Sequence, residues 1–119
     1  MSDLPFDPDR LAEELAADAD VVRDLRDSGD APDIVRPVDV HFVGEAATIA
    51  RLEGEIEALG WTVVEVELDD DGYVTLSVQR EQTTTDAALR TLTEDALRVE
   101  AAYGVSYDGW GTVAVSSAT

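Results

Sequence analysis

Three stretches of the chain carry apolar residues at the spacing of amphipathic helices. In residues 9–27 they recur at near-heptad spacing and give one narrow stripe, whereas in residues 45–59 and 86–103 they step by three and four. Gly60 and Gly104 follow the last two stretches, and a glycine in the left-handed conformation commonly ends a helix. The pattern therefore predicts three helices over these ranges.

Alternation of apolar and polar residues indicates four strands. The first covers about residues 35–43, and a hairpin follows, in which residues 64–68 and 74–78 alternate on either side of three aspartates and Gly72. An Asp-Gly pair is typical of tight hairpin turns. The last strand covers about residues 107–115. We expect the apolar face of the first three strands to pack against the helices; its side chains are Val38, Val40, Phe42, Val64, Val66, Leu68, Val74, Leu76 and Val78.

Without the first helix, the order of the elements is strand, helix, strand, strand, helix, strand. This is the split βαβ pattern of the ferredoxin-like sandwich. We predict one α+β domain over residues 1–119, with a four-stranded antiparallel sheet and two helices on one face in a core of about residues 35–116, plus an extra N-terminal helix at about residues 9–27. The other face is open to water, partly covered by the first helix, or the working surface; its side chains are Asp39, His41, Glu65, Glu67, Thr75, Ser77 and Gln79.

Charge narrows the classes of partner. Asp and Glu total 27 against 8 basic residues, all of them arginine, and the net charge is −19. Direct binding to nucleic acid or to an anionic membrane is disfavoured, because both need clustered cations. The acidic surface either binds a basic protein partner or is an adaptation to a salt-rich cytoplasm. Adaptation is favoured, because the acids are spread along the whole chain.

Cysteine usage and hydropathy bear on the compartment. The chain has no cysteine, which rules out disulfides, thiol catalysis and thiolate metal sites. Its first residues show neither the basic nor the apolar region of a secretory signal. No apolar run approaches the roughly 18 residues that a membrane span needs. We therefore expect a cytoplasmic protein.

Few residues offer chemistry. Asp39 and His41 leave the same face of a strand, so the carboxylate could orient the imidazole for acid–base catalysis. No motif places a nucleophile or a second base, so a solvated polar face is the preferred interpretation. A single histidine makes a poor metal site, and three adjacent aspartates lack the alternating ligands of a calcium loop. We predict no catalytic residue, no metal and no cofactor.

The last predicted strand contains an unusual aromatic residue. Trp110 lies between Gly109 and Gly111, and glycine within a strand often marks a bulge or a close approach of backbone. A tryptophan in this place either fills the core or serves as a binding anchor. Core filling is preferred, since most large aromatic side chains are packed inside.

Two stretches resemble a known family. Residues 107–112, Tyr-Asp-Gly-Trp-Gly-Thr, are similar to the closing motif of the regulator of ribonuclease E activity B family. Residues 25–33 and 38–42 resemble that family's Asp-Gly-Ser-Asp-Pro-Asp turn and its His-His-Phe strand, with Val40 where the family often has the first histidine. The resemblance spans about residues 12–113, including the extra first helix. It implies a non-enzymatic protein that binds the scaffold region of ribonuclease E and restrains its cleavage of RNA.

The preferred hypothesis is therefore an acidic regulatory protein that binds a ribonuclease or another RNA-degradation component, as a monomer or a weak dimer. The predicted binding residues are His41, Tyr107, Asp108, Gly109, Trp110 and Gly111. The alternative is a small-ligand-binding or self-associating module of a salt-adapted cytoplasm, with Trp110 as an aromatic anchor on the open face of the sheet.

Overall fold

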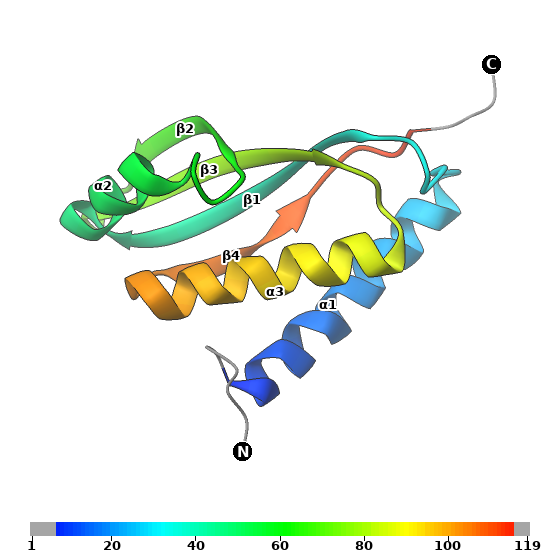
Figure 1. Cartoon of the computed structure of the whole chain (residues 1–119), viewed down its shortest axis with the longest axis horizontal. Helices are drawn as coiled ribbons and strands as arrows, with labels where there is room; N and C mark the ends of the chain where they lie inside the picture. Colours follow the sequence, from blue (N-terminus) through cyan, green and yellow to red (C-terminus); the bar gives the residue numbers. More distant parts are fainter. Residues whose placement is uncertain (1–6, 116–119) are drawn as a thin grey trace.

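The computed structural model describes residues 7–115, which form one β-sheet with helices packed against it (Figure 1). In chain order its elements are α1 (Pro8–Asp27), β1 (Arg36–Glu45), α2 (Ala46–Glu55), β2 (Thr62–Leu68), β3 (Tyr73–Gln82), α3 (Asp86–Tyr103) and β4 (Ser106–Gly111). The strands form an antiparallel sheet in the order β2-β3-β1-β4. This arrangement confirms the predicted α+β fold with its extra N-terminal helix.

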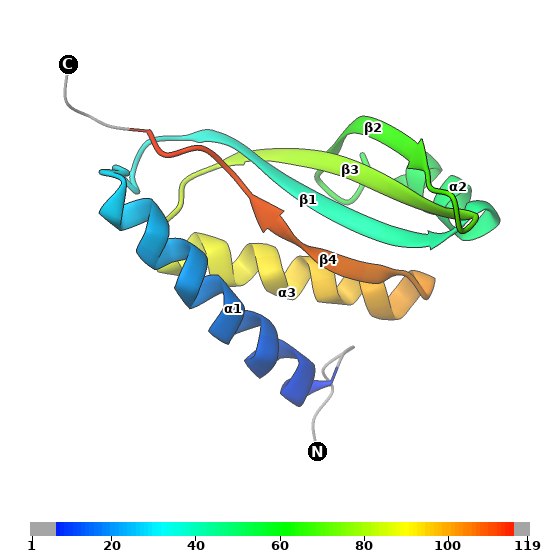
Figure 2. The same ribbon diagram turned by 180° about the vertical axis from the view of Figure 1, so that it is seen from behind.

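The helices lie in one layer against the sheet. α2 contacts β1 and β3, α3 contacts β4, and their buried apolar side chains join those of the sheet in a single cluster. α1 packs against α3 and lies on the β4 side of the molecule, as both views show (Figures 1 and 2). Among the described residues, the opposite face of the sheet therefore has no covering helix. Within residues 7–115, no helix is both long and apolar enough to cross a bilayer.

Local sequence signals explain where the helices begin and end. The Asp7 carboxylate accepts a hydrogen bond from the Asp9 amide at 2.9 Å and caps α1. Thr85 caps α3 in the same way, and Gly104, with φ of 74°, ends that helix. Both helices match the prediction to within one residue. α2 is shorter than predicted: residues 56–60 form tight turns instead, which carry the buried Trp61 into the core.

β2 departs from the prediction. Val64, Val66 and Leu68 were expected to face the core, but they are 53%, 45% and 68% exposed. β2 is an edge strand, and α2 packs over β1 and β3 instead of over β2. In addition, Val63 pairs with Val78 and Glu65 pairs with the adjacent Ser77. Val64 is therefore an extra, unpaired residue. Only Val63 of this strand packs against the core.

The last strand is also shorter than predicted, because side chains take over the role of a strand partner after Gly111. The carbonyl of Val113 accepts a hydrogen bond from Arg36, and the amide of Val115 donates one to Asp30. Backbone groups that are satisfied in this way do not need a neighbouring strand. Residues 112–115 therefore follow β1 without joining the sheet.

Candidate functional site

The Asp-Gly pair in the C-terminal motif forms a β-bulge. Val40 of β1 pairs with Trp110, and Phe42 pairs with Tyr107, so Asp108 and Gly109 together lie opposite one residue of β1. Gly109 has φ of +89°, which a residue with a side chain adopts only with strain. Side chains of a regular strand alternate, and residues three apart would face opposite sides. The extra residue brings both aromatic side chains to the helix side of the sheet.

Trp110 is anchored there by a partly buried polar contact. Its Nε1 donates a hydrogen bond to one carboxylate oxygen of Asp18 in α1 at 2.8 Å, and Thr93 of α3 donates to the other oxygen at 2.6 Å. Trp110 is 9% exposed. Burial raises the pKa of the Asp18 carboxyl, and the two hydrogen bonds oppose that rise. The motif's tryptophan thus joins the N-terminal helix to the sheet.

Tyr107 is anchored beside it and is 4% exposed. Its amide donates to Glu100 at 2.9 Å, and its carbonyl accepts from Arg10 of α1 at 3.2 Å. Arg10 also binds the two carboxylate oxygens of Glu100 at 3.1 and 3.2 Å. Burial raises the pKa of the Tyr107 phenol, and the nearby Asp18 carboxylate raises it further. These contacts again tie α1 to α3 and β4.

A buried ion pair lies at the second stretch that carries the family resemblance: Asp30 belongs to residues 25–33, and Arg36 lies between them and residues 38–42. Arg36 Nη1 lies 2.6 Å from Asp30 Oδ1, and the side chains are 2% and 0% exposed. Asp30 also accepts hydrogen bonds from the Thr84 hydroxyl at 2.6 Å and the Val115 amide at 2.8 Å. Burial alone would raise the pKa of Asp30, but these bonds and Arg36 outweigh it and hold the pKa below its ordinary value.

Every nitrogen of the Arg36 guanidinium has at least one hydrogen-bond partner. It donates to three backbone carbonyls, those of Ala31, Ile34 and Val113. The ion pair therefore holds together the α1–β1 loop, the β3–α3 loop and the segment after β4. The two motifs that resemble the family are, in this structure, devices that join the elements of the fold.

The predicted binding residues are divided between two sides of the sheet. His41 and Gly111 line one shallow hollow of about 350 Å³ on the open face, together with Asp39 and Gln79. Asp108 follows the inward-facing Tyr107, lies opposite His41 in the pairing of β1 with β4, and is exposed. His41 Nδ1 lies 2.9 Å from the Ser77 hydroxyl of the neighbouring strand. Within residues 7–115 no three His, Asp or Glu side chains gather as metal ligands.

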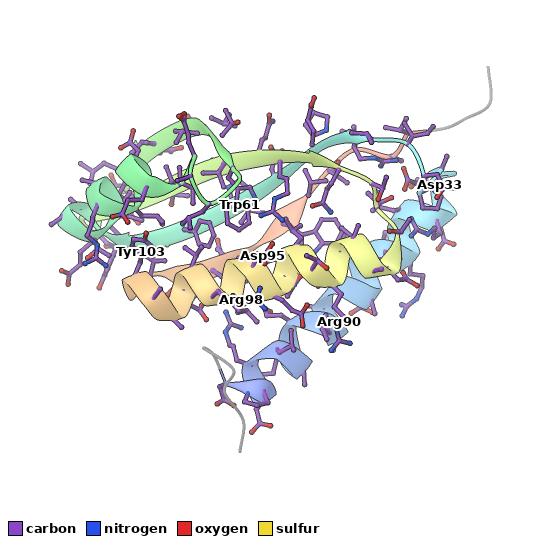
Figure 3. All side chains as sticks on the ribbon, viewed as in Figure 1. Asp33, Trp61, Arg90, Asp95, Arg98 and Tyr103 are labelled. Atoms are coloured by element: carbon purple, nitrogen blue, oxygen red, sulfur yellow. The ribbon has the colours of Figure 1, made fainter. Side chains whose placement is uncertain are left out.

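A groove that was not predicted lies between α3 and the turn after α2. Its volume is about 250 Å³, and it is lined by Leu59, Trp61, Asp95, Arg98, Val99, Ala102 and Tyr103; Figure 3 labels four of these residues. Arg80 stacks 4.2 Å from the Trp61 ring centre and binds Asp95 at 3.0 Å. Trp61 Nε1 is buried without a hydrogen-bond partner in the described part of the chain. In the sequence, the signal for Trp61 was its place directly after Gly60, the glycine that was predicted to end the second helix.

The comparisons with known proteins give one result. The sequence model of the family described as regulator of ribonuclease activity B matches residues 15–112. A search of curated protein sequences gave no significant match. The matched range begins within α1, ends one residue after β4, and includes the bulge, the Asp18 contact and the buried ion pair. The chain therefore belongs to the regulator of ribonuclease activity B family.

Proposed function

We propose that this protein restrains a ribonuclease, or another component of RNA degradation, by binding it as a protein and without catalysing a reaction itself. Membership of the regulator of ribonuclease activity B family carries the proposal, because the match covers most of the chain. The arrangement of polar side chains supports a non-enzymatic role. His41, the single histidine, has the Ser77 hydroxyl as its partner at 2.9 Å. Within residues 7–115 no hydrogen bond joins His41 to the Asp39 carboxylate, so the imidazole lacks the third group that orients a catalytic base.

The charge of the chain supports a protein as the target in preference to RNA. A net charge of −19 repels phosphate backbones. The same charge attracts the basic segments with which ribonucleases and their associated proteins hold RNA. A protein that occupies such a segment lowers RNA cleavage by competition, and no catalytic group is needed for that effect.

The open face of the sheet is the proposed contact surface. Among the predicted residues, His41, Asp108 and Gly111 lie on it or at its border, and Asp39 adds a carboxylate beside them. Tyr107 and Trp110 support this face from behind, because their side chains are buried among the helices. Their substitution therefore affects binding through folding, which makes them unsuitable as a first test of contact.

The proposal is tested by capture and then by reconstitution. The tagged protein is incubated with native extract at the salt concentration of the cell, and bound proteins are identified. RNA cleavage by the captured nuclease is then measured with and without added protein. We expect enrichment of a ribonuclease or RNA-degradation component and slower cleavage.

Matched variants show which surface is responsible. Asp39→Asn/Asp108→Asn removes two negative charges from the open face, and Asp24→Asn/Asp27→Asn removes two from the exposed side of α1. The first variant should lose capture and the second should keep it. Capture of no RNA-degradation component, or unchanged cleavage rates, would contradict the proposal.

The groove over Trp61 favours small-ligand binding as a second candidate function. The groove is mostly apolar, and the indole N–H beneath it is a donor without a partner in the described residues. Nuclear magnetic resonance of the Trp61 indole during titration with small aromatic acids and amides tests this candidate. If no fragment shifts the Trp61 signal and the protein still restrains the nuclease, small-ligand binding is excluded as the function.

A further inference from the structure

We propose that the edge strand β2 receives an extended segment of the partner protein as a fifth strand of the sheet, and that basic and apolar side chains alternate along this segment. The inference rests on the proposed function only for the existence of a protein partner. The surface itself is argued from the edge position, exposed side chains and charge of β2.

β2 is an open edge. It pairs with β3 on one side, and no strand or helix of residues 7–115 pairs with it on the other, so its outward backbone donors and acceptors can pair with an added strand. The opposite edge of the sheet is different, since α1 lies beside β4 and binds it through Asp18 and Arg10. β2 also contains no proline, and residues 65–68, which follow the bulge at Val64, form a regular stretch that suits pairing.

Apolar exposure in the described part of the chain is concentrated around this strand. Eight large apolar side chains are exposed within residues 7–115. Five of them fall within residues 59–73, with exposed fractions of 42–68%: Leu59, Val64, Val66, Leu68 and Tyr73. Val66 and Leu68 pair with Leu76 and Val74 and so lie on the helix side of the sheet, beyond the cover of α2. An added strand would cover them with its own apolar side chains.

The charge around β2 selects the partner. Residues 52–79 contain eight acidic residues and no basic one. Glu65 and Glu67 pair with Ser77 and Thr75 on the open face, and neither glutamate forms an ion pair within residues 7–115. A strand with Arg or Lys at alternate positions would place cations beside both glutamates and apolar groups beside Val66 and Leu68.

A second copy of this chain is the poorer occupant. Two copies of β2 side by side would bring Glu65 and Glu67 of each close to those of the other, with the three aspartates of both hairpin turns nearby. Charges on an edge strand are a known protection against such self-pairing. The charges that repel a second copy attract a basic segment, so protection from aggregation and partner choice come from the same two residues.

The experiment uses three labelled seven-residue peptides and the full-length protein. One peptide alternates arginine and valine, the second alternates glutamate and valine, and the third has the first peptide's composition arranged in two blocks. Binding is measured by fluorescence anisotropy, and contact by amide chemical shifts. We expect the alternating arginine peptide to bind about tenfold more tightly than either of the others, with shifts concentrated in residues 62–68.

Two charge reversals of equal size locate the site. Glu65→Arg/Glu67→Arg should weaken binding of the arginine peptide about tenfold and let the glutamate peptide bind. Asp24→Arg/Asp27→Arg changes the net charge by the same amount on the exposed side of α1 and should leave binding within about twofold. Equal binding of the block peptide, or equal loss in the α1 variant, would show unspecific charge attraction and overturn the proposal.

The nuclease experiment separates this inference from the proposed function. If Glu65→Arg/Glu67→Arg captures and restrains the nuclease as well as the unmodified protein does, the β2 surface is wrong and the function stands. If the arginine peptide adds to β2 and no RNA-degradation component is captured or restrained, the surface stands and the proposed function is wrong.

Discussion

The two edges of the sheet are built in opposite ways. At β4, the chain places Trp110 and Tyr107 inward, and partly buried polar contacts join this edge to α1. At β2, apolar side chains remain exposed to water, and none of the helices in residues 7–115 packs over them. The C-terminal motif that resembles the family lies on the first side, at the β4 edge. The family resemblance therefore comes in part from residues that hold the fold together. The second side carries no such motif, and its apolar side chains are exposed where those of the first are buried.

The attachment of α1 shows why the first side needs polar residues. Of its apolar stripe, Leu11 and Leu25 are buried, whereas Leu15 and Val22 remain partly exposed along a groove toward α3. A narrow stripe gives limited apolar burial, and burial alone does not fix the position of a helix. Hydrogen bonds of buried polar groups are directional and costly to leave unmade, so they specify one arrangement.

The largest effect should come from breaking the buried ion pair. Asp30→Ala leaves Arg36 charged and buried, and we expect a loss of about 3–5 kcal/mol in the free energy of unfolding, measured by urea or thermal unfolding. Asp33→Ala, at an exposed position of the same loop, should cost less than about 0.5 kcal/mol. Asp30→Ala/Arg36→Met should recover part of the loss. Equal stability of the two single variants would contradict this role of the ion pair.

Removing one indole N–H should have the next largest effect. Trp110→Phe deprives the half-buried Asp18 carboxylate of a donor, and a hydrogen bond to a charged group is worth about 2 kcal/mol. Trp61→Phe makes the same change where the indole N–H has no partner among the described residues, so it should cost clearly less. Chemical unfolding of the two variants measures the difference. A loss at Trp61 equal to that at Trp110 would show that ring volume, and not the Asp18 bond, is what counts.

Two glycine-to-alanine changes should act with opposite signs. Gly109→Ala forces a side chain into the positive φ of the bulge and should cost about 1–2 kcal/mol. Gly54→Ala, within α2 on the other side of the molecule, should stabilise by about 0.5–1 kcal/mol through better helix propensity. Nothing lies within 4 Å of a Cβ at either position, so crowding does not contribute. Thermal unfolding of both variants tests the pair, and a neutral Gly109→Ala would argue against the bulge.

Asp18 and Asp30 should respond to pH in opposite directions. The folded pKa of Asp18 is raised, so the stability of the unmodified protein relative to Asp18→Asn should rise as pH falls through that pKa toward about 3.9, the unfolded value. The folded pKa of Asp30 is lowered, so the stability it contributes is present above about 3.9 and is lost as pH falls through its folded pKa. Melting temperatures of the unmodified protein, Asp18→Asn and Asp30→Ala between pH 7 and pH 3 measure both differences. Parallel curves for the two variants would contradict the assignment.

The sequence predicts what depends on local pattern. Periodicity and caps located α1 and α3 to within one residue, and the hairpin turn at Asp69 and Gly72 formed as expected, with the Asp69 carboxylate accepting from the amides of Asp71 and Tyr73. The role of Trp110 was also within reach: Tyr107 and Trp110 are three apart, and a glycine between them allows a bulge that turns both inward. The partner of Trp110 was not predictable, because Asp18 lies 92 positions away and nothing local marks it.

β2 shows where pattern reasoning fails. Val64, Val66 and Leu68 alternate with glutamates, and this pattern is the same whether a helix covers the strand or the strand is an exposed edge. Whether α2 reaches over the strand depends on where the helix ends, and α2 ends at Glu55, earlier than its apolar spacing predicted. Trp61 was missed for a related reason, since it enters the core from a turn, outside any periodic stretch.

The smallest effect on stability is expected at β2, and it sharpens the comparison between the edges most directly. Val66 and Val78 both lie on the helix side of neighbouring strands, yet Val66 is largely exposed and Val78 is fully buried. Val66→Thr should change the free energy of unfolding by less than about 0.5 kcal/mol, whereas Val78→Thr buries a hydroxyl and should cost about 1–3 kcal/mol. Urea unfolding of both variants gives the values. If Val66→Thr costs as much as Val78→Thr, the apolar side chains of β2 serve the fold after all, and the two edges do not differ in kind. If it costs little but weakens binding of the alternating arginine peptide, apolar residues that stability does not require are exposed for contact with a partner.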